Sequence, residues 1–324
     1  MNSMTQQYTW IEDMNNNTYG IDEKNPHDQD EALQQYLKYY QFNMKAVDEY
    51  RCGTVRASGK KQFIQFFLKQ QPAGTVYLVH GYLDHSGGLS RTINQLLQRG
   101  YQVIVLDLPG HGFSEGNEGL LTSFDDYIAA IEQGYHLILD KLDLKSVAGL
   151  GHSTGGALLF HASAEKRVKL ESLILAAPLY YPYQWKLFEG LLTLSGKVIS
   201  RKKRGFKKNS EDKIYQQFLR SDPLQVRVLT AEWVTALKEW QLKIEGCPVA
   251  EQPVYVLQGT RDTTVDWKQN IRFYREKCGE FQVALFPGAR HQLLNERKEI
   301  TNLAHQRIHE FLRNRSVFSQ ARKG

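Results

Sequence analysis

The hydrophobic pattern of the chain begins weakly and then becomes regular. Residues 1–30 are rich in Asn, Asp and Gln and predict a loose polar arm. A helix is predicted next, because apolar residues recur at helical spacing at Leu33, Tyr36, Leu37 and Tyr40. Residues 47–56 and 62–69 then have strand character, and they predict an antiparallel hairpin at the edge of a sheet.

From Thr75 onward, short apolar runs alternate with amphipathic stretches. The apolar runs predict strands at 75–81, 101–110, 146–150, 172–178, 253–259 and 281–288. Helices are predicted between them and at the end of the chain, at 92–99, 124–141, 154–166, 267–278 and 296–314. Continuous apolar strands that alternate with helices are typical of a parallel sheet covered on both faces.

One segment interrupts this alternation. Residues 179–250 have helical character, many aromatic and basic residues, and no obvious strand. We therefore expect an α/β fold with a mostly parallel central sheet, helices on both faces, and a helical cap over the C-terminal edge of the sheet, where open α/β sheets bind ligands. The predicted organisation is a polar arm (1–30), the first part of the core (31–178), the cap (179–250) and the second part of the core (251–324).

Composition and charge are those of an ordinary globular protein. The excess of 41 Lys and Arg over 35 Asp and Glu gives a net charge of +6, which is too small to indicate a nucleic-acid partner. The three cysteines are far apart in sequence and predict free thiols in a reducing compartment. No signal peptide and no apolar stretch of membrane-spanning length is visible, so we expect a cytoplasmic protein.

The strongest chemical signal is the run from Gly151 to Gly155, which reads Gly-His-Ser-Thr-Gly. It lies between a predicted strand and a predicted helix, the context that a nucleophile elbow requires. The glycines permit a sharp turn, and the turn lifts the hydroxyl of Ser153 above the sheet. Ser153 is therefore the predicted nucleophile of an acyl-transfer reaction.

A serine hydroxyl needs a base, and the base needs an orienting acid. After the elbow these partners follow in the order acid and then histidine. Asp262 comes directly after the strand at 253–259, and His291 comes directly after the strand at 281–288. We expect Asp262 and His291 to complete a triad with Ser153, with Asp266 as the competing acid.

The site also needs donors for an oxyanion. The backbone N–H of Thr154 follows the nucleophile, and the loop after the strand at 75–81 offers the backbone N–H of Tyr82 behind the small Gly81. His80 is expected to support this loop by hydrogen bonding. The glycine-rich run 107–114 lacks a phosphate-loop pattern, and the histidines lack metal-ligand spacing, so no cofactor and no metal are predicted.

At this point the sequence resembles a known family. The runs HGYLDHSGG, DLPGHGFSEG, GHSTGG, GTRDTTVD and GARHQLLNE occur in the order and approximate spacing of the monoacylglycerol lipase and bacterial lysophospholipase branch of the α/β-hydrolases. The resemblance covers residues 50–312 and implies the same triad, the same two oxyanion donors and a helical cap. Thr154 departs from the pattern, since Met or Gln is common there, which leaves the backbone donor intact but alters the pocket floor.

The cap is expected to select the substrate. Its large apolar side chains suit an acyl chain, and Tyr82, Tyr180, Tyr181 and Phe188 are predicted to line the pocket. The resemblance implies small monoacyl lipid esters as substrates, of the lysophospholipase or monoacylglycerol lipase type. A carboxylesterase of small esters and a proline-type aminopeptidase are alternatives on the same fold. The aminopeptidase needs cap acids to hold an α-ammonium, and this cap is basic. An inactive binding module is disfavoured by the intact triad residues.

The cap also carries a candidate membrane contact. An apolar stretch at 186–200 with helical spacing precedes a basic run, and this combination is typical of an interfacial anchor. The basic residues are Arg201, Lys202, Lys203, Arg204, Lys207 and Lys208. We hypothesise peripheral contact with the anionic inner face of a membrane. The alternative is a cap helix packed on the sheet, followed by a solvated loop.

Overall fold

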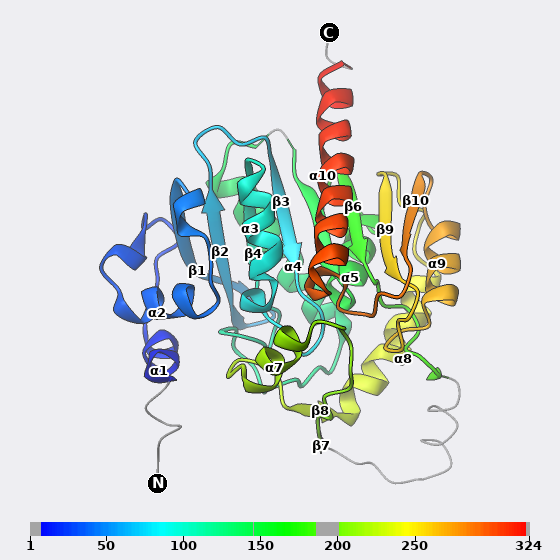
Figure 1. Cartoon of the computed structure of the whole chain (residues 1–324), viewed down its shortest axis with the longest axis horizontal. Coiled ribbons are helices and arrows are strands. Elements are labelled where there is room, and N and C mark those ends of the chain that lie inside the picture. Colours follow the sequence, from blue (N-terminus) through cyan, green and yellow to red (C-terminus); the bar gives the residue numbers. More distant parts are fainter. Residues whose placement is uncertain (1–7, 145, 186–200, 322–324) are drawn as a thin grey trace.

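A single eight-stranded sheet forms the centre of the molecule (Figure 1). The computed structural model describes residues 8–144, 146–185 and 201–321. The strand order is β1-β2-β4-β3-β5-β6-β9-β10. The strands are β1 (Glu49–Ala57), β2 (Lys60–Leu68), β3 (Gly74–Val79), β4 (Tyr101–Leu106), β5 (Ala148–His152), β6 (Ser172–Ala176), β9 (Val254–Gly259) and β10 (Phe281–Phe286).

The pairing of the strands agrees with the prediction. β1 and β2 form an antiparallel hairpin at one edge, and β2 pairs antiparallel with β4. All remaining pairs are parallel, from β4 through β3, β5, β6 and β9 to β10. The inner strands are buried along their whole length, as expected for parallel strands with helices on both faces. The predicted α/β fold is confirmed.

Helices cover both faces of the sheet (Figure 1). One face carries α3 (Ser90–Gln98) and α10 (Lys298–Ala321), which contact each other. The other face carries α4 (Phe124–Lys141), α5 (Thr154–Ala164) and α9 (Trp267–Glu276), with α4 packed on α5. Each face has its own cluster of buried apolar side chains. The carboxyl ends of the parallel strands therefore lie at one common edge between two packed layers.

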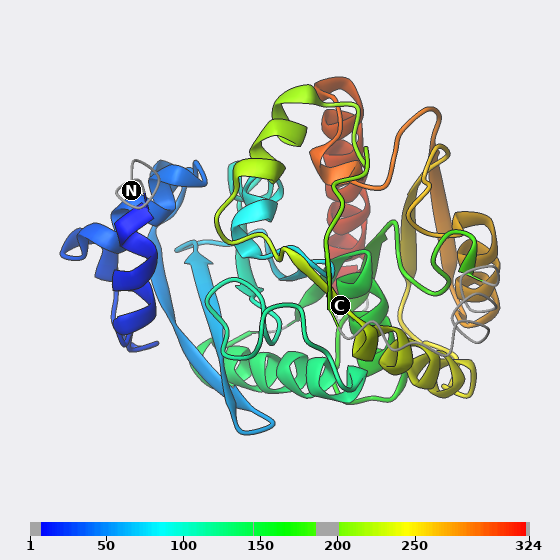
Figure 2. The same cartoon turned by 90° about the horizontal axis from the view of Figure 1, so that it is seen from below.

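The N-terminal arm is not loose from Thr9 onward, and this prediction was wrong. Residues Thr9–Asn16 form α1, which packs on α2 (Glu31–Tyr39) beside the β1 edge of the sheet (Figure 2). The side chains of Trp10 and Met14 are 3% and 4% exposed. Trp10 lies among the rings of Tyr36, Tyr40 and other aromatics. The apolar side chains of this Asn-rich segment are ordered because the rest of the chain supplies their partners.

The cap also differs from its prediction, because it contains strands. In the part of the cap that the structure describes, the helices are α7 (Lys213–Ser221) and α8 (Ala231–Glu245), and β7 (Arg201–Lys203) pairs antiparallel with β8 (Val228–Thr230). Strands of three residues are too short to produce a recognisable alternation of polar and apolar positions. These elements lie together beyond the edge at which the parallel strands end (Figure 1). The apolar stretch predicted at 186–200, with Phe188, lies outside the described residues.

Candidate active site

Ser153 occupies the sharp turn between β5 and α5. Its backbone angles, φ 52° and ψ −116°, lie in a region that L-residues rarely adopt. The flanking glycines make this turn possible: a Cβ on Gly151 would lie 2.4 Å from the backbone nitrogen of Gly156, and one on Gly155 would lie 2.4 Å from the carbonyl oxygen of His80. The local geometry is therefore that of a nucleophile elbow.

The structure brings Ser153, His291 and Asp262 together. The Nε2 atom of His291 lies 3.0 Å from the hydroxyl oxygen of Ser153, and its Nδ1 atom lies 2.8 Å from Oδ2 of Asp262. Asp262 follows β9 and His291 follows β10, so three strand ends supply the three groups. The three residues are 8%, 5% and 3% exposed for Ser153, His291 and Asp262, which shields the hydrogen-bonded chain from competing water.

Asp262 is held as a carboxylate. Its Oδ1 atom accepts from the backbone N–H groups of Thr264 at 2.8 Å and Val265 at 3.2 Å, and its Oδ2 atom accepts from the amide of Gln258 at 3.1 Å. Burial alone would raise the pKa of Asp262, but the neighbouring His291 and the two N–H groups hold that pKa below its ordinary value. An ionised, fixed acid of this kind orients the imidazole beside it.

Asp266, the competing acid, has a structural role. Its carboxylate accepts from the N–H of Gln269 at 3.3 Å and caps the start of α9. Asp262 rather than Asp266 contacts His291.

Two backbone N–H groups lie beside the serine. Thr154 is the first residue of α5, so its N–H has no partner within the helix. Gly81 packs so closely on the elbow that a Cβ there would lie 3.2 Å from Cβ of Ser153, and the next N–H along the chain is that of Tyr82. Within the described part of the chain, neither Tyr82 nor Thr154 donates its N–H to a hydrogen bond. These are the groups that the sequence predicts as oxyanion donors.

Buried neutral histidines support this region. His80 donates from Nδ1 to the carbonyl of Gly81 at 2.8 Å and accepts from the N–H of Leu108 at 2.9 Å, which fits the supporting role predicted for it. Burial holds the pKa of His80 well below its ordinary value, and burial with the nearby His291 lowers the pKa of His152 to about 3. The ring of His152 lies 3.1 Å from the carbonyl oxygen of His291. In the described residues, no three His, Cys, Asp or Glu side chains are grouped to hold a metal.

Among the predicted pocket residues, Tyr82 has the clearest place. Its ring stacks on Trp233 of α8 at 4.9 Å, and its hydroxyl donates to the carbonyl of Gly119 at 2.7 Å. Tyr180 stacks on Phe273 at 3.9 Å and donates to Glu245, so its contacts are those of a packing residue between the cap and α9. The pocket roles of Tyr82, Tyr180 and Tyr181 stay predictions.

Some basic side chains of the cap are bound within the protein, and others are exposed to solvent. Arg204 was predicted to face a membrane, but its guanidinium turns inward to the carbonyl oxygens of Leu83 and Val226, because buried carbonyls there need a donor. Lys208 forms an ion pair with Glu211, which also pairs with Arg290, the residue before His291. Lys202, Lys203 and Lys207 are exposed, and the side chain of Arg201 lies outside the described residues.

The fold and the elbow define an α/β-hydrolase. The chain belongs to the family described as serine aminopeptidase, S33, whose model matches residues 70–298. It is 25% identical over 291 residues to a monoglyceride lipase of Rattus norvegicus, covering 83% of this chain and 92% of that protein. It is 25% identical over 250 residues to phospholipase YtpA of Bacillus subtilis, covering 70% of this chain and 90% of that protein.

Solved structures show the same fold. A soluble variant of the monoglyceride lipase of Saccharomyces cerevisiae, in complex with a substrate analogue, has a TM-score of 0.69 at 19% identity. The match covers 81% of this chain and 94% of that chain. The resemblance stated from the sequence motifs is confirmed. In the part of the chain that the structure describes, every helix is too short or too polar to cross a membrane.

Proposed function

We propose that this protein hydrolyses carboxylic esters of monoacyl lipids through an acyl-enzyme on Ser153. The observation that carries the proposal is the hydrogen-bonded chain from Ser153 through His291 to Asp262, with the serine on a strained elbow. A hydroxyl becomes a useful nucleophile only beside an oriented base, and this geometry provides one.

The steps follow from the positions of the atoms. Nε2 of His291 takes the proton of Ser153 as its oxygen attacks the ester carbonyl, and Asp262 stabilises the resulting imidazolium. The N–H groups of Tyr82 and Thr154 bind the oxyanion of the tetrahedral intermediate. Collapse breaks the ester bond, and the leaving alcohol receives the proton from His291. Water then attacks the acyl-enzyme with the same base, which releases the fatty acid and restores Ser153.

The substrate class is proposed from the cap and from the relatives. Proteins called monoglyceride lipase and phospholipase match most of this chain. A proline-type aminopeptidase would need a free cap carboxylate for an α-ammonium group. Asp222 is bound to His85 and Tyr40, and Glu211 is paired with Lys208 and Arg290, but one carboxylate oxygen of Glu232 has no hydrogen-bond partner among the described residues. An aminoacyl amide and an ester of a small alcohol are therefore the alternatives that the substrate panel tests.

We still propose a cytoplasmic protein that contacts the anionic inner face of a membrane, but with fewer contacting residues. Its candidate residues in the described cap are the exposed Lys202, Lys203 and Lys207. Each contributes about 1 kcal/mol near an anionic leaflet, falling with salt. Co-sedimentation with anionic vesicles should weaken when all three are changed to Ser. Equal binding of both proteins to anionic and neutral vesicles would remove membrane contact from the proposal.

The decisive experiment is Ser153→Ala. It should abolish labelling by a fluorophosphonate and lower turnover by about four to six orders of magnitude. Ser221→Ala, a change of an exposed cap serine, serves as the control and should label like the wild type. The substrate panel is a monoacylglycerol, a lysophospholipid, a short p-nitrophenyl ester and an aminoacyl amide. Preferential cleavage of the amide would overturn the lipid-ester proposal, and full labelling of the Ala variant would place the nucleophile elsewhere.

A further inference from the structure

The loop that carries Tyr82 is held mainly from the cap. We call residues 81–85, which follow β3, the oxyanion loop. Leu83 within it has φ 70°, a left-handed conformation that a Leu adopts only when its surroundings enforce it. Residues of the cap contact three successive residues of this loop, which are Leu83, Asp84 and His85.

Leu83 is bound by Arg204. The guanidinium donates to the carbonyl of Leu83 at 3.1 Å, and the same nitrogen donates to Gln225 at 2.9 Å and to the carbonyl of Val226 at 3.2 Å. The guanidinium also lies 4.8 Å from the ring centre of Phe206. Arg204, which directly follows β7, therefore links the cap to the strained residue of the oxyanion loop.

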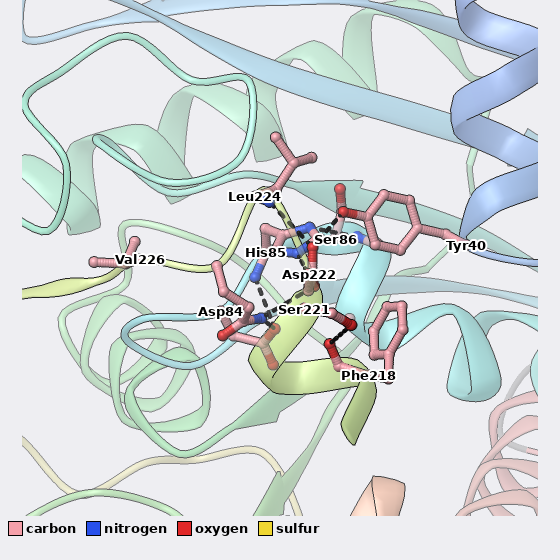
Figure 3. A network of polar contacts seen from close by, with 12 residues as sticks. Tyr40, Asp84, His85, Ser86, Phe218, Ser221, Asp222, Leu224 and Val226 are labelled. Carbon is pink, nitrogen blue, oxygen red and sulfur yellow. Dashed lines mark hydrogen bonds and ion pairs between the residues drawn. The ribbon is translucent and has the colours of Figure 1, made fainter. Parts of the chain in front are cut away.

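The next two residues are bound by the end of α7 and the segment after it. The side chain of Gln225 donates to Asp84 at 3.0 Å, and Nε2 of His85 lies 2.9 Å from Oδ2 of Asp222. Tyr40 at the end of α2 donates its hydroxyl to the other oxygen of Asp222 at 2.6 Å, so this helix end reinforces the contact. Figure 3 shows Tyr40, His85 and Asp222 converging from three separate parts of the chain. All of these side chains are buried.

Inside the oxyanion loop, the carbonyl of Gly81 and the N–H of Leu83 are also bound. The carbonyl of Gly81 accepts from His80 at 2.8 Å and from the N–H of Asp84 at 3.1 Å. The N–H of Leu83 donates to His111 at 3.1 Å. A trans peptide directs its N–H opposite to its C=O, so fixing the Gly81 carbonyl fixes the direction of the Tyr82 N–H. The direction of the Tyr82 N–H is thus set by the groups around it.

We propose that Arg204, together with Gln225 and Asp222, positions the Tyr82 N–H, so that the cap completes the oxyanion site. These are positioning residues, since they act through Leu83, Asp84 and His85 and touch no reacting atom. The inference rests on the proposed function. It predicts that loss of one cap contact weakens stabilisation of the oxyanion without removing the serine, its base or its acid.

The test compares Arg204→Gln with Arg91→Gln. Arg91 also joins the core to the cap, through Asp212 at 2.8 Å, but the contacts of its side chain are with Asp212 and Tyr215 rather than the oxyanion loop. Complete fluorophosphonate labelling gives the concentration of active sites in each protein, so partial unfolding does not enter the result. The readouts are kcat and KM for a short p-nitrophenyl ester, the labelling rate constant, and the Ki of a trifluoromethyl ketone that forms a tetrahedral adduct with serine.

Arg204→Gln should lower kcat per active site by about 10- to 100-fold, less than the loss of a whole oxyanion donor. KM should stay within about twofold, and the labelling rate and the ketone affinity should fall by factors similar to that for kcat. Arg91→Gln should match the wild type in all four readouts, and Arg204→Lys, which keeps one donor for the Leu83 carbonyl, should recover part of the loss. If Arg204→Gln does not fold, Arg204→Lys carries the test, with a smaller loss expected.

Unchanged kcat per active site in Arg204→Gln, or equal losses in the Arg91 variant, would overturn the positioning role. A failure of the proposed function looks different. In that case the wild-type protein would cleave no ester of the panel, while the labelling rates of the variants would still measure whether Arg204 positions the donor.

Discussion

The molecule contains two buried pairs of an aspartate and a histidine with nearly the same geometry. Nδ1 of His291 lies 2.8 Å from Oδ2 of Asp262, and Nε2 of His85 lies 2.9 Å from Oδ2 of Asp222. What differs is the second ring nitrogen. In His291 it faces the hydroxyl of Ser153, whereas in His85 it accepts from the N–H of Gly87 at 3.2 Å. The first pair is arranged to move a proton, and the second is arranged to hold the cap against the core.

The comparison shows that the pair alone does not define a role. Asp262 and His291 follow neighbouring strands β9 and β10, so the sheet itself brings them together. Asp222 and His85 lie in the cap and in the loop after β3, and only the tertiary fold joins them. A carboxylate–imidazole pair becomes a candidate for catalysis when its free nitrogen meets a nucleophile.

The largest expected effect separates the two pairs by turnover. Asp262→Asn should lower kcat for a short ester by about 10⁴-fold, because an amide neither fixes the imidazole tautomer nor stabilises the imidazolium. Asp222→Asn should lower kcat per active site by no more than about 100-fold, since it acts only through the oxyanion loop. Steady-state kinetics normalised by fluorophosphonate labelling measure both. Equal losses would mean that the two pairs are not functionally distinct.

A second experiment sharpens the comparison through pH. Burial alone would lower the pKa of His85, but the carboxylates of Asp222, Asp84 and Asp107 raise that pKa to about 9. The N–H of Gly87 opposes protonation, yet one hydrogen bond contributes about 1 kcal/mol, whereas a charge pair as close as that with Asp222 contributes roughly 4 kcal/mol at an effective dielectric constant of about 20. We therefore expect an imidazolium at neutral pH, in which Nδ1 carries a proton and no longer accepts from the N–H of Gly87.

The sign of the pH effect follows from this raised pKa. The unfolded chain has a histidine pKa of about 6.5, so the contribution of His85 to folding is complete below that pH and is lost as pH rises through about 9. Urea unfolding between pH 6 and 9.5 should show the wild-type free energy of unfolding falling with pH. The slope should be shallower in Asp222→Asn, where the main partner charge is gone. Parallel curves for the two proteins would show that the imidazole ring of His85 is uncharged over this whole pH range.

The smallest expected effect concerns the third aspartate of the region. Asp266→Ala should reduce the free energy of unfolding by about 1 kcal/mol, because α9 loses its N-cap, and should leave kcat within about twofold. Asp266→Asn retains a good capping group and is the matched control. A loss of turnover comparable to that of Asp262→Asn would return Asp266 to the list of candidate acids.

The sequence allowed the sheet and the catalytic candidates to be predicted for a physical reason. Each candidate directly follows an apolar run, and parallel strands bring their carboxyl ends to one edge, so local pattern was enough to place Ser153, Asp262 and His291 together. The long helix α4 was predicted with the bounds that the structure shows, Phe124–Lys141. The spacing of apolar residues within an element, and the order of the elements along the chain, can both be read directly from the sequence.

Other features could not be predicted because their causes lie far away in the chain. His85 and Tyr40, which both bind Asp222, lie 137 and 182 residues away from it in the sequence. Nothing near Arg204 indicates that it binds the carbonyl of Leu83 instead of solvent. The same holds for Trp10, whose Asn-rich surroundings suggest disorder until the distant aromatic rings are in place.

The position of the cap between β6 and β9 has a consequence for how the chain is made. When Ala176 leaves the ribosome, β6 can already pair with β5, but its other side stays open until β9 begins at Val254. Until then this edge of β6 presents unpaired backbone N–H and C=O groups, and its side chains, which are buried in the finished protein, lack part of their cover, so the strand is prone to pair with other chains. At about 5–20 residues per second, the exposure lasts on the order of 4–15 seconds. Destabilised variants of this protein should therefore be lost by aggregation during synthesis, and chaperones that cover apolar strands should raise their yield.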